Sequence, residues 1–147
     1  MNTRCWSTWP CAAARGLELD RQVAADACIE SDPTLVRSIL QNLMTNAVEY
    51  TPPRGRLEIV FAGGANRFTL TIANSTTGLD PSDLEHFFQR FWRKDAVRTA
   101  GVHCGLGLSL SRAFAELLGW QLEAELDPAE ANGQRRLRLC LTGPVKP

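Results

Sequence analysis

The chain has 147 residues, of which 44% are hydrophobic and 22% charged, a composition typical of one globular domain with a buried core. This composition excludes a disordered or collagen-like chain. Sixteen basic side chains balance sixteen acidic ones, so no net positive field favours a nucleic acid partner. No apolar run reaches the roughly 18–20 residues of a membrane span, and residues 1–10 lack the pattern of a signal peptide. We expect a cytoplasmic domain without direct membrane contact, and leave open an inner-membrane anchor elsewhere in a full-length protein.

The cysteines predict idle thiols in a reducing compartment rather than a disulfide framework or a zinc site. They are odd in number, widely spread and without a C-x-x-C pair, and only two histidines could join them as ligands. Their positions are Cys5, Cys11, Cys28, Cys104 and Cys140.

The chain is interpreted as one domain, residues 16–147, preceded by a leader at residues 1–15. The leader carries two tryptophans and an alanine run, so it is either the end of a larger upstream helical domain or a cloning remnant. Alternation of apolar and polar residues predicts a short strand at 17–20 and a second one through 27–29.

A helix is predicted to begin after Asp32, whose side chain is a helix cap and is followed by Pro33 at the first helical position. Apolar residues then recur every four positions until Tyr50, where two prolines end the pattern. Two alternating segments, 57–61 and 68–72, flank a glycine-rich turn and predict a β-hairpin.

The second half of the chain predicts more helices and strands. A short helix starting at Asp80 carries the apolar residues Leu84, Phe87, Phe88, Phe91 and Trp92, and a mobile loop follows at 93–104. A further helix runs from 105 to 118 and ends at Gly119, before strands at 120–126 and 137–141. The predicted fold is an α+β two-layer sandwich, with a mixed, mostly antiparallel sheet and about three helices on one face.

Three groups of polar and glycine residues are candidates for function. Asn42, Asn46 and Glu49 follow the i, i+4, i+7 spacing of one helix face, which fits either a solvent-exposed side or a half-buried ligand surface. Residues 74–79 are either an ordinary turn with Gly78 at positive φ or part of a site. The glycines of residues 105–108 either serve helix packing or let backbone N–H groups approach an anion.

These groups, in this order, resemble the four sequence boxes of one family, the ATP-binding catalytic domain of bacterial sensor histidine kinases. Residues 42–52 resemble its N box, N-L-x-x-N-A-x-x-Y-T-P, and residues 74–79 look like a worn form of its D-x-G-x-G box. Residues 87–93 are similar to its F-E-R-F-Y-R box, and residues 105–110 to its G-L-G-L-S-L box. The family belongs to the superfamily that also contains gyrase, MutL and a heat-shock chaperone.

The resemblance implies roles for individual residues. Asn46 would coordinate Mg²⁺ with the ATP phosphates, and Asn42 would stand where related ATPases place a glutamate base. Asn74 would accept a hydrogen bond from the adenine amino group. Further residues would line the adenine pocket (Tyr50, Gly78, Leu79), reach the phosphates (Arg93), or present the glycine box to them (Gly105, Leu106, Gly107, Leu108), with residues 93–104 as the lid.

Departures from the family pattern affect the same box residues. Asn74 replaces the usual aspartate, and a neutral amide oxygen accepts a weaker hydrogen bond than a carboxylate does. Glu49 stands where a basic residue is common, so its carboxylate repels a triphosphate unless a cation offsets it. Val102 and His103 replace glycine before the glycine box and stiffen the hinge of the lid.

The resemblance implies a Mg-ATP-binding catalytic domain of a two-component sensor histidine kinase. Neither His86 nor His103 precedes an acidic residue upstream of the N box, so the acceptor histidine would lie on a separate dimerisation domain, and a response regulator would be the downstream partner. Two alternatives remain: a degenerate module that regulates a partner by contact, and a serine-directed anti-sigma kinase of the same superfamily.

Overall fold

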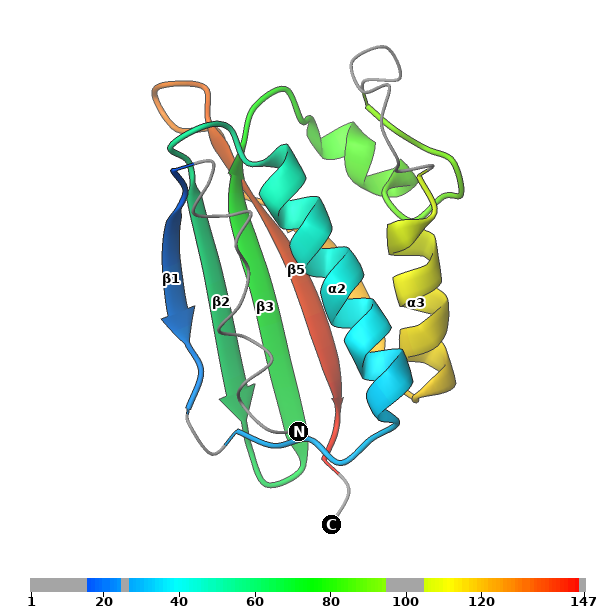
Figure 1. The fold of residues 1–147 in the computed structure, drawn as a ribbon. Coiled ribbons are helices and arrows are strands. Elements are labelled where there is room, and N and C mark those ends of the chain that lie inside the picture. Colours follow the sequence, from blue (N-terminus) through cyan, green and yellow to red (C-terminus); the bar gives the residue numbers. More distant parts are fainter. Residues whose placement is uncertain (1–15, 25–26, 95–104, 146–147) are drawn as a thin grey trace.

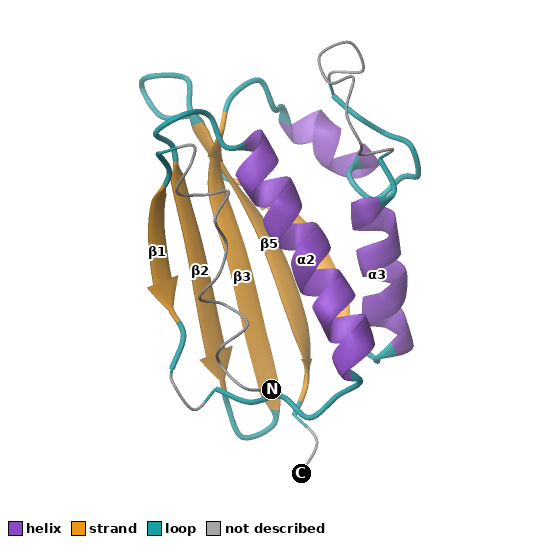
Figure 2. Cartoon of the chain, viewed as in Figure 1, coloured by secondary structure: helices purple, strands orange, loops and turns teal. Residues whose placement is uncertain are grey.

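The computed structural model describes residues 16–24, 27–94 and 105–145, which form a five-stranded sheet with helices on one face (Figure 1). The predicted leader at 1–15 and the predicted lid residues from 95 to 104, with their hinge, lie outside these residues. In chain order the elements are β1 Glu18–Gln22, α2 Pro33–Tyr50, β2 Arg56–Gly63, β3 Arg67–Thr76, the 3₁₀ helix η2 Pro81–His86, α3 Gly107–Leu117, β4 Gln121–Leu126 and β5 Arg135–Pro144 (Figure 2).

The sheet has the strand order β1-β2-β3-β5-β4. Only β1 and β2 run parallel, and every other neighbouring pair is antiparallel. The predicted hairpin joins β2 to β3, with Ile59 opposite Ile72. The prediction of an α+β sandwich with a mixed, mostly antiparallel sheet is confirmed.

The predicted strand through residues 27–29 is wrong, because residues 27–30 form neither strand nor helix. The Ala27 N–H donates to the Ala24 carbonyl at 3.1 Å. No strand of the described sheet pairs with residues 27–30. Their apolar side chains instead pack on the core, with Val23 and Ile29 half-buried against it.

Helix α2 begins and ends where the sequence predicted. The Asp32 side chain accepts hydrogen bonds from the N–H groups of Thr34 (2.8 Å) and Leu35 (3.1 Å), and Pro33 occupies the first helical turn. Its buried stripe faces the sheet and consists of Val36, Ile39, Leu43, Met44, Ala47 and Val48. The helix ends where Thr51 adopts an extended conformation.

The core lies between α2, α3 and the inner face of the sheet. Alternate residues of β2, β3 and β5 point into it and are buried: Leu57, Ile59, Phe68, Leu70, Ile72, Leu137, Leu139 and Leu141. The Phe68 ring meets Trp120 edge-on at 4.8 Å. A Cβ atom on Gly143 would lie 2.3 Å from the Trp120 ring, so only glycine fits beneath that ring.

The region after β3 is less helical than predicted. Residues 81–86 form a 3₁₀ helix, and the hydrogen bonds that follow are again three residues apart, such as Phe87 N–H to Leu84 O and Gln89 N–H to His86 O. Phe91 has φ of 64°, which ends any continuation of the helix. The predicted apolar residues 84–92 therefore lie on a 3₁₀ helix and a run of turns.

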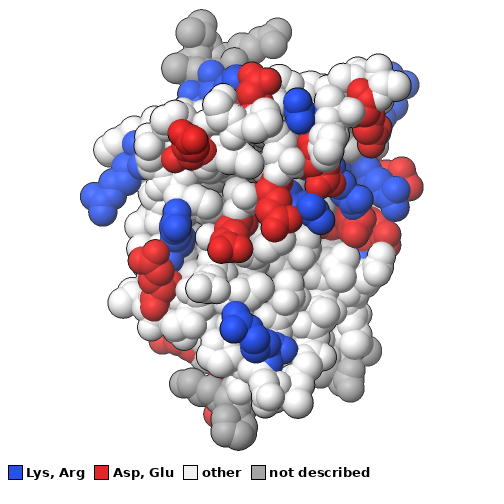
Figure 3. Space-filling model, turned by 180° about the vertical axis from the view of Figure 1, so that it is seen from behind, with Lys and Arg blue, Asp and Glu red and all other residues white. Residues whose placement is uncertain are grey.

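The outer face of the sheet carries ion pairs between strands (Figure 3). Glu58 of β2 pairs with Arg136 of β5, across the intervening strand β3. Ala73 on β3 is opposite Glu58 and Arg138 in the register, and its small side chain is buried between them. Arg138 in turn pairs with Asp127 at 2.8 Å, so the outward arginines of β5 are charge-balanced.

Candidate functional site

A cavity of about 360 Å³ opens at the C-terminal end of α2, between this helix, residues 92–94 and the start of α3. The structure brings all of the predicted site residues except Asn74 and Gly78 into its wall. The predicted residues that line it are Asn42, Asn46, Tyr50, Leu79, Arg93, Gly105, Leu106, Gly107 and Leu108. Residues from all four sequence boxes thus share one wall, with Leu79 representing the box at 74–79.

The amides of α2 form one side of this cavity. Asn42 Nδ2 donates to the Gly107 carbonyl at 3.2 Å, which ties α2 to the first turn of α3. The Oδ1 atom of Asn46 is buried, and no described residue gives it a hydrogen bond. Because a buried oxygen without a donor is unfavourable, Asn46 Oδ1 fits a metal or ligand partner.

The first turn of α3 forms the opposite side. Gly105 has φ of 71°, and a Cβ atom there would lie 3.0 Å from the Phe91 backbone, so glycine is required. The Phe91 N–H donates to the Gly105 carbonyl at 3.0 Å. Leu106 caps the helix and gives no side-chain hydrogen bond, so the first N–H groups of α3 are available to an anion.

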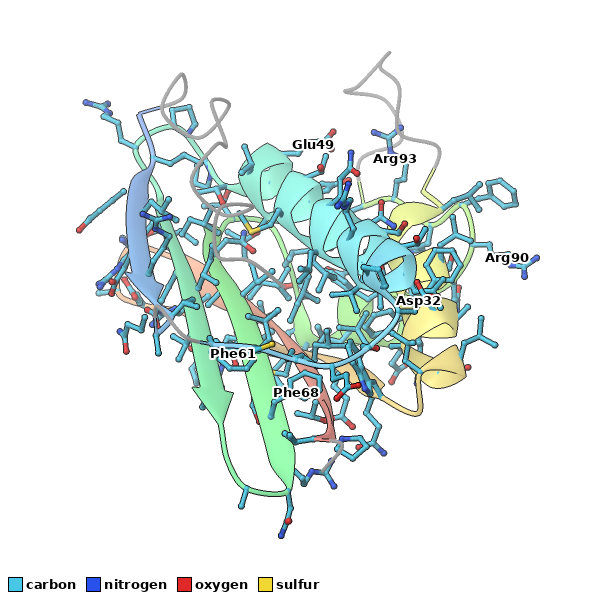
Figure 4. The ribbon with its side chains drawn as sticks, turned by 60° about the horizontal axis from the view of Figure 1, so that its bottom comes forward. Asp32, Glu49, Phe61, Phe68, Arg90 and Arg93 are labelled. Carbon is cyan, nitrogen blue, oxygen red and sulfur yellow. The ribbon has the colours of Figure 1, made fainter. Side chains whose placement is uncertain are left out.

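Charged residues stand at the rim of the cavity. Glu49, near the end of α2, and Arg93 lie at the same end of the molecule, whereas Asp32 is at the other end of the helix (Figure 4). Arg90 extends outward from the molecule in the same view and does not line the cavity. Glu49, whose carboxylate is expected to repel a triphosphate, therefore lines the same cavity as the cationic Arg93.

Lys94 is a rim residue that the sequence analysis did not select. Its Nζ lies 2.6 Å from Asp83 Oδ2 and 3.4 Å from Asp80 Oδ2. Burial raises the pKa of Asp83, but hydrogen bonds from Lys94 and from the Asp80 N–H outweigh burial and leave it below its ordinary value of 3.8. The hydrogen bond to Asp83 raises the pKa of Lys94. The pair is therefore charged at neutral pH.

Asn74 and Gly78 lie outside the cavity wall. Asn74 is 1% exposed, and by register it lies between Leu57 and Leu137, the second of which lines the cavity. Its Nδ2 donates to the Ser75 carbonyl at 3.0 Å, whereas its buried Oδ1 has no partner among the described residues. Gly78 has the expected positive φ of 77°.

Several lining residues were not selected from the sequence, although four of them lie within the boxes: Thr45, Phe87, Trp92 and Leu110. The full set is Gln41, Thr45, Phe87, Trp92, Lys94, Leu110 and Leu137. Helical spacing offered a signal for two of them, because Gln41 and Thr45 each precede a box asparagine on α2. Leu137 reaches the cavity only through sheet register, which no local pattern reports.

Two absences concern the described part of the chain. No group of three His, Cys, Asp or Glu residues within 16–24, 27–94 and 105–145 is arranged to bind a metal ion. None of the helices in the described part of the chain is long and apolar enough to cross a membrane.

Comparison with known proteins supplies the class. A family model described as "Histidine kinase-, DNA gyrase B-, and HSP90-like ATPase" matches residues 31–144. The sensor histidine kinase HprS of Escherichia coli K12 is 37% identical over 102 residues, which cover 69% of this chain and 22% of HprS. The probable sensor protein PcoS of Escherichia coli is 31% identical over 104 residues, which cover 70% of this chain and 22% of PcoS. The chain spans about a fifth of the length of these relatives.

Solved structures agree in fold. The mycobacterial sensor histidine kinase MprB superimposes with a TM-score of 0.75 at 23% identity, covering 94% of this chain and 90% of that one. Full-length ShkA, solved in complex with AMPPNP, gives a TM-score of 0.72 at 21% identity, and the match covers 94% of this chain and 28% of ShkA.

The fold and the family match define an ATP-binding ATPase domain, and the chain belongs to the histidine kinase-, DNA gyrase B- and HSP90-like ATPase family. Within that family it is a catalytic domain of the sensor histidine kinase type. The resemblance drawn from the four sequence boxes is confirmed.

Proposed function

We propose that the domain holds Mg²⁺-bound ATP in the amide-lined cavity and directs its γ-phosphoryl group to a histidine on a separate helical dimerisation domain. One observation carries this proposal: the unpartnered Oδ1 of Asn46 and the uncapped N-terminus of α3 face one cavity. An oxygen ligand for a hard cation beside an anion-binding helix end suits a triphosphate with its metal.

The phosphate end is assigned to α2 and α3. Asn46 would hold Mg²⁺, which when bound neutralises part of the phosphate charge. The N–H groups at Gly107 and Leu108 would orient the phosphates, and Arg93 would add positive charge from the rim. Phosphoryl transfer mainly requires such positioning and charge neutralisation from the protein.

Asn42 is assigned a role that favours transfer over hydrolysis. A neutral amide cannot deprotonate a water molecule as a carboxylate does. Its Nδ2 also donates to the Gly107 carbonyl, so Asn42 holds the glycine box in place. ATP would therefore stay intact until an acceptor side chain arrives.

The adenine end is assigned to Asn74, Tyr50 and Leu79. The Nδ2 hydrogen bond to the Ser75 carbonyl leaves Asn74 Oδ1 as the free acceptor for the adenine amino group. Tyr50 is 41% exposed at the end of α2 and would lie against the base together with Leu79. Gly78 would let the backbone of this turn approach the ring.

The acceptor is assigned to another domain. His86 is exposed on the surface, with its ring 6.2 Å from that of Trp92, and it lies outside the cavity wall. A helical domain with the phosphorylated histidine and a response regulator would be the partners, and no nucleic acid is required.

Radiolabelled ATP tests the proposal. The domain alone should hydrolyse ATP very slowly and remain unlabelled, whereas a cognate histidine domain added in trans should acquire acid-labile phosphate. Acid-stable label on the chain itself would favour the serine-directed kinase. Nucleotide binding without any transfer would favour the degenerate regulatory module, to which the neutral amide at Asn74 and the carboxylate at Glu49 lend support.

A further inference from the structure

One lysine and two aspartates form an ion cluster beside the cavity, at the start of η2. Lys94 Nζ contacts Asp83 Oδ2 at 2.6 Å and Asp80 Oδ2 at 3.4 Å. Asp83 Oδ2 also accepts the Asp80 N–H at 2.7 Å, so this one oxygen joins η2 to Lys94. Lys94 is the residue after Arg93, and both line the cavity.

The two aspartates hold Lys94 unequally. The Asp83 side chain is only 12% exposed, and its short contact with Lys94 is screened little by solvent. Asp80 is 67% exposed, and its longer contact is worth little at a surface. Asp83 is therefore the residue that fixes the lysine, and Asp80 is a natural control that carries the same charge.

We propose that Lys94 is a positioning residue: Asp83 anchors it to η2, and this anchor fixes Arg93 at the phosphate side of the cavity. Consecutive Cα atoms are about 3.8 Å apart, so holding one side chain constrains its neighbour's backbone. Arg93 is thus set by a contact that does not itself touch the nucleotide. The inference rests on the proposed function, because it concerns ATP phosphates.

A direct role for Lys94 as a phosphate ligand makes the opposite prediction. If Lys94 exchanged Asp83 for a phosphate, Asp83→Asn would release it from this competition and tighten ATP binding. A positioning lysine needs Asp83, so the same substitution weakens ATP binding. The sign of the Asp83→Asn effect therefore separates the two roles.

Calorimetric titration of the full chain with Mg·ATP and with adenosine is the first measurement. We expect Lys94→Met and Asp83→Asn each to weaken ATP binding by about three- to tenfold, the size of one ordinary hydrogen bond, and the double variant to weaken it no further. Adenosine affinity should be unchanged, and Lys94→Arg should bind ATP within about twofold of the wild type because it retains the cation. Asp80→Asn should behave like the wild type.

Amide hydrogen exchange without nucleotide is the second measurement. Lys94→Met and Asp83→Asn should speed exchange at Trp92, Arg93 and Lys94, whereas Asp80→Asn should leave it unchanged. Tighter ATP binding in Asp83→Asn would overturn the inference in favour of a phosphate ligand. Equal effects of Asp83→Asn and Asp80→Asn, or equal losses for ATP and adenosine, would overturn it in favour of bulk charge or general destabilisation.

The two proposals fail in different ways. A wild-type chain that does not bind Mg·ATP overturns the proposed function. The exchange comparison then still decides whether Asp83 and Lys94 fix Arg93, and unchanged exchange in both variants would overturn that part of the inference.

Discussion

The two ends of α2 border two cavities of different character. At its C-terminal end, a cavity of about 360 Å³ is lined by amides, charged side chains and the uncapped start of α3. Near its N-terminal end, a cavity of about 50 Å³ is lined by apolar residues: Val23, Ala27, Ile29, Val36, Leu40, Phe61, Leu70, Trp120 and Leu141. The first end has a buried oxygen, Asn46 Oδ1, to which no described residue donates a hydrogen bond, whereas the second is a small apolar hollow.

This difference separates binding from stability within one helix. The free energy of unfolding should depend mainly on the apolar end, where side chains are close-packed. Nucleotide affinity should depend mainly on the amide end, where Asn46 Oδ1 lacks a partner. Substitutions at the two ends should therefore change different measured quantities.

The largest expected effect is at the apolar end. Leu70→Ala removes a buried side chain, 2% exposed, from the wall of an existing apolar cavity, and should lower the free energy of unfolding by about 3–5 kcal/mol. Leu137→Ala is the matched variant at the amide end and should cost less, about 2–3 kcal/mol, because water can enter the enlarged polar cavity. Urea unfolding measures both, and equal losses would remove the distinction between the two ends.

Asn46→Ala should produce the next largest effect, and on binding rather than on stability. Loss of the proposed metal ligand should weaken the binding of Mg·ATP by about 10- to 100-fold and leave the affinity for adenosine unchanged. Removal of Mg²⁺ with a chelator should weaken ATP binding by the wild type but not by this variant. Ser38→Ala, on the same helix but outside the cavity wall, is the control. Equal losses of affinity for ATP and adenosine would contradict the assignment of Asn46 as a metal ligand.

Asn74→Asp should tighten ATP binding by about 1 kcal/mol, because a carboxylate accepts a stronger hydrogen bond from the adenine amino group. Without nucleotide the same variant should be less stable, since it buries a charge where the Oδ1 of Asn74 has no described partner. Titration with ATP and GTP measures the first effect and urea unfolding the second. A similar gain for GTP, which has a carbonyl in place of the amino group, would contradict the assignment.

The smallest expected effect is a gain in stability at the apolar end. Val36→Ile adds one methyl group toward the 50 Å³ cavity and should raise the free energy of unfolding by about 0.5–1 kcal/mol. Val48→Ile makes the same change where neither cavity offers space, so it should be neutral or destabilising. If both variants gained equally, the stabilisation would not come from filling the cavity.

The sequence predicted features that depend on residues close together along the chain. The start of α2 followed from Asp32 and Pro33, and the spacing of Asn42 and Asn46 identified the face of the helix that lines the cavity. The glycine box was located by its Gly-Leu-Gly-Leu pattern, and Gly105 has a positive φ that glycine tolerates easily.

Features that depend on distant residues were not predicted. Asp83 and Lys94 are eleven residues apart and meet only because turns follow η2. Glu58 and Arg136 meet across 78 residues through the sheet register. The apolar alternation at 27–29 predicted a strand, but Ile29 packs against the core without strand pairing, and alternation alone does not distinguish the two arrangements.

The hydrogen bond from Phe91 N–H to the Gly105 carbonyl also bears on how this domain tolerates insertions. It fixes the positions of Phe91 and Gly105 relative to each other by a backbone contact. Doubling the length of a flexible loop costs only about 0.6 kcal/mol in closure entropy. A peptide epitope inserted after position 94, with the glycine at position 105 left in place, should therefore cost the domain little folding free energy.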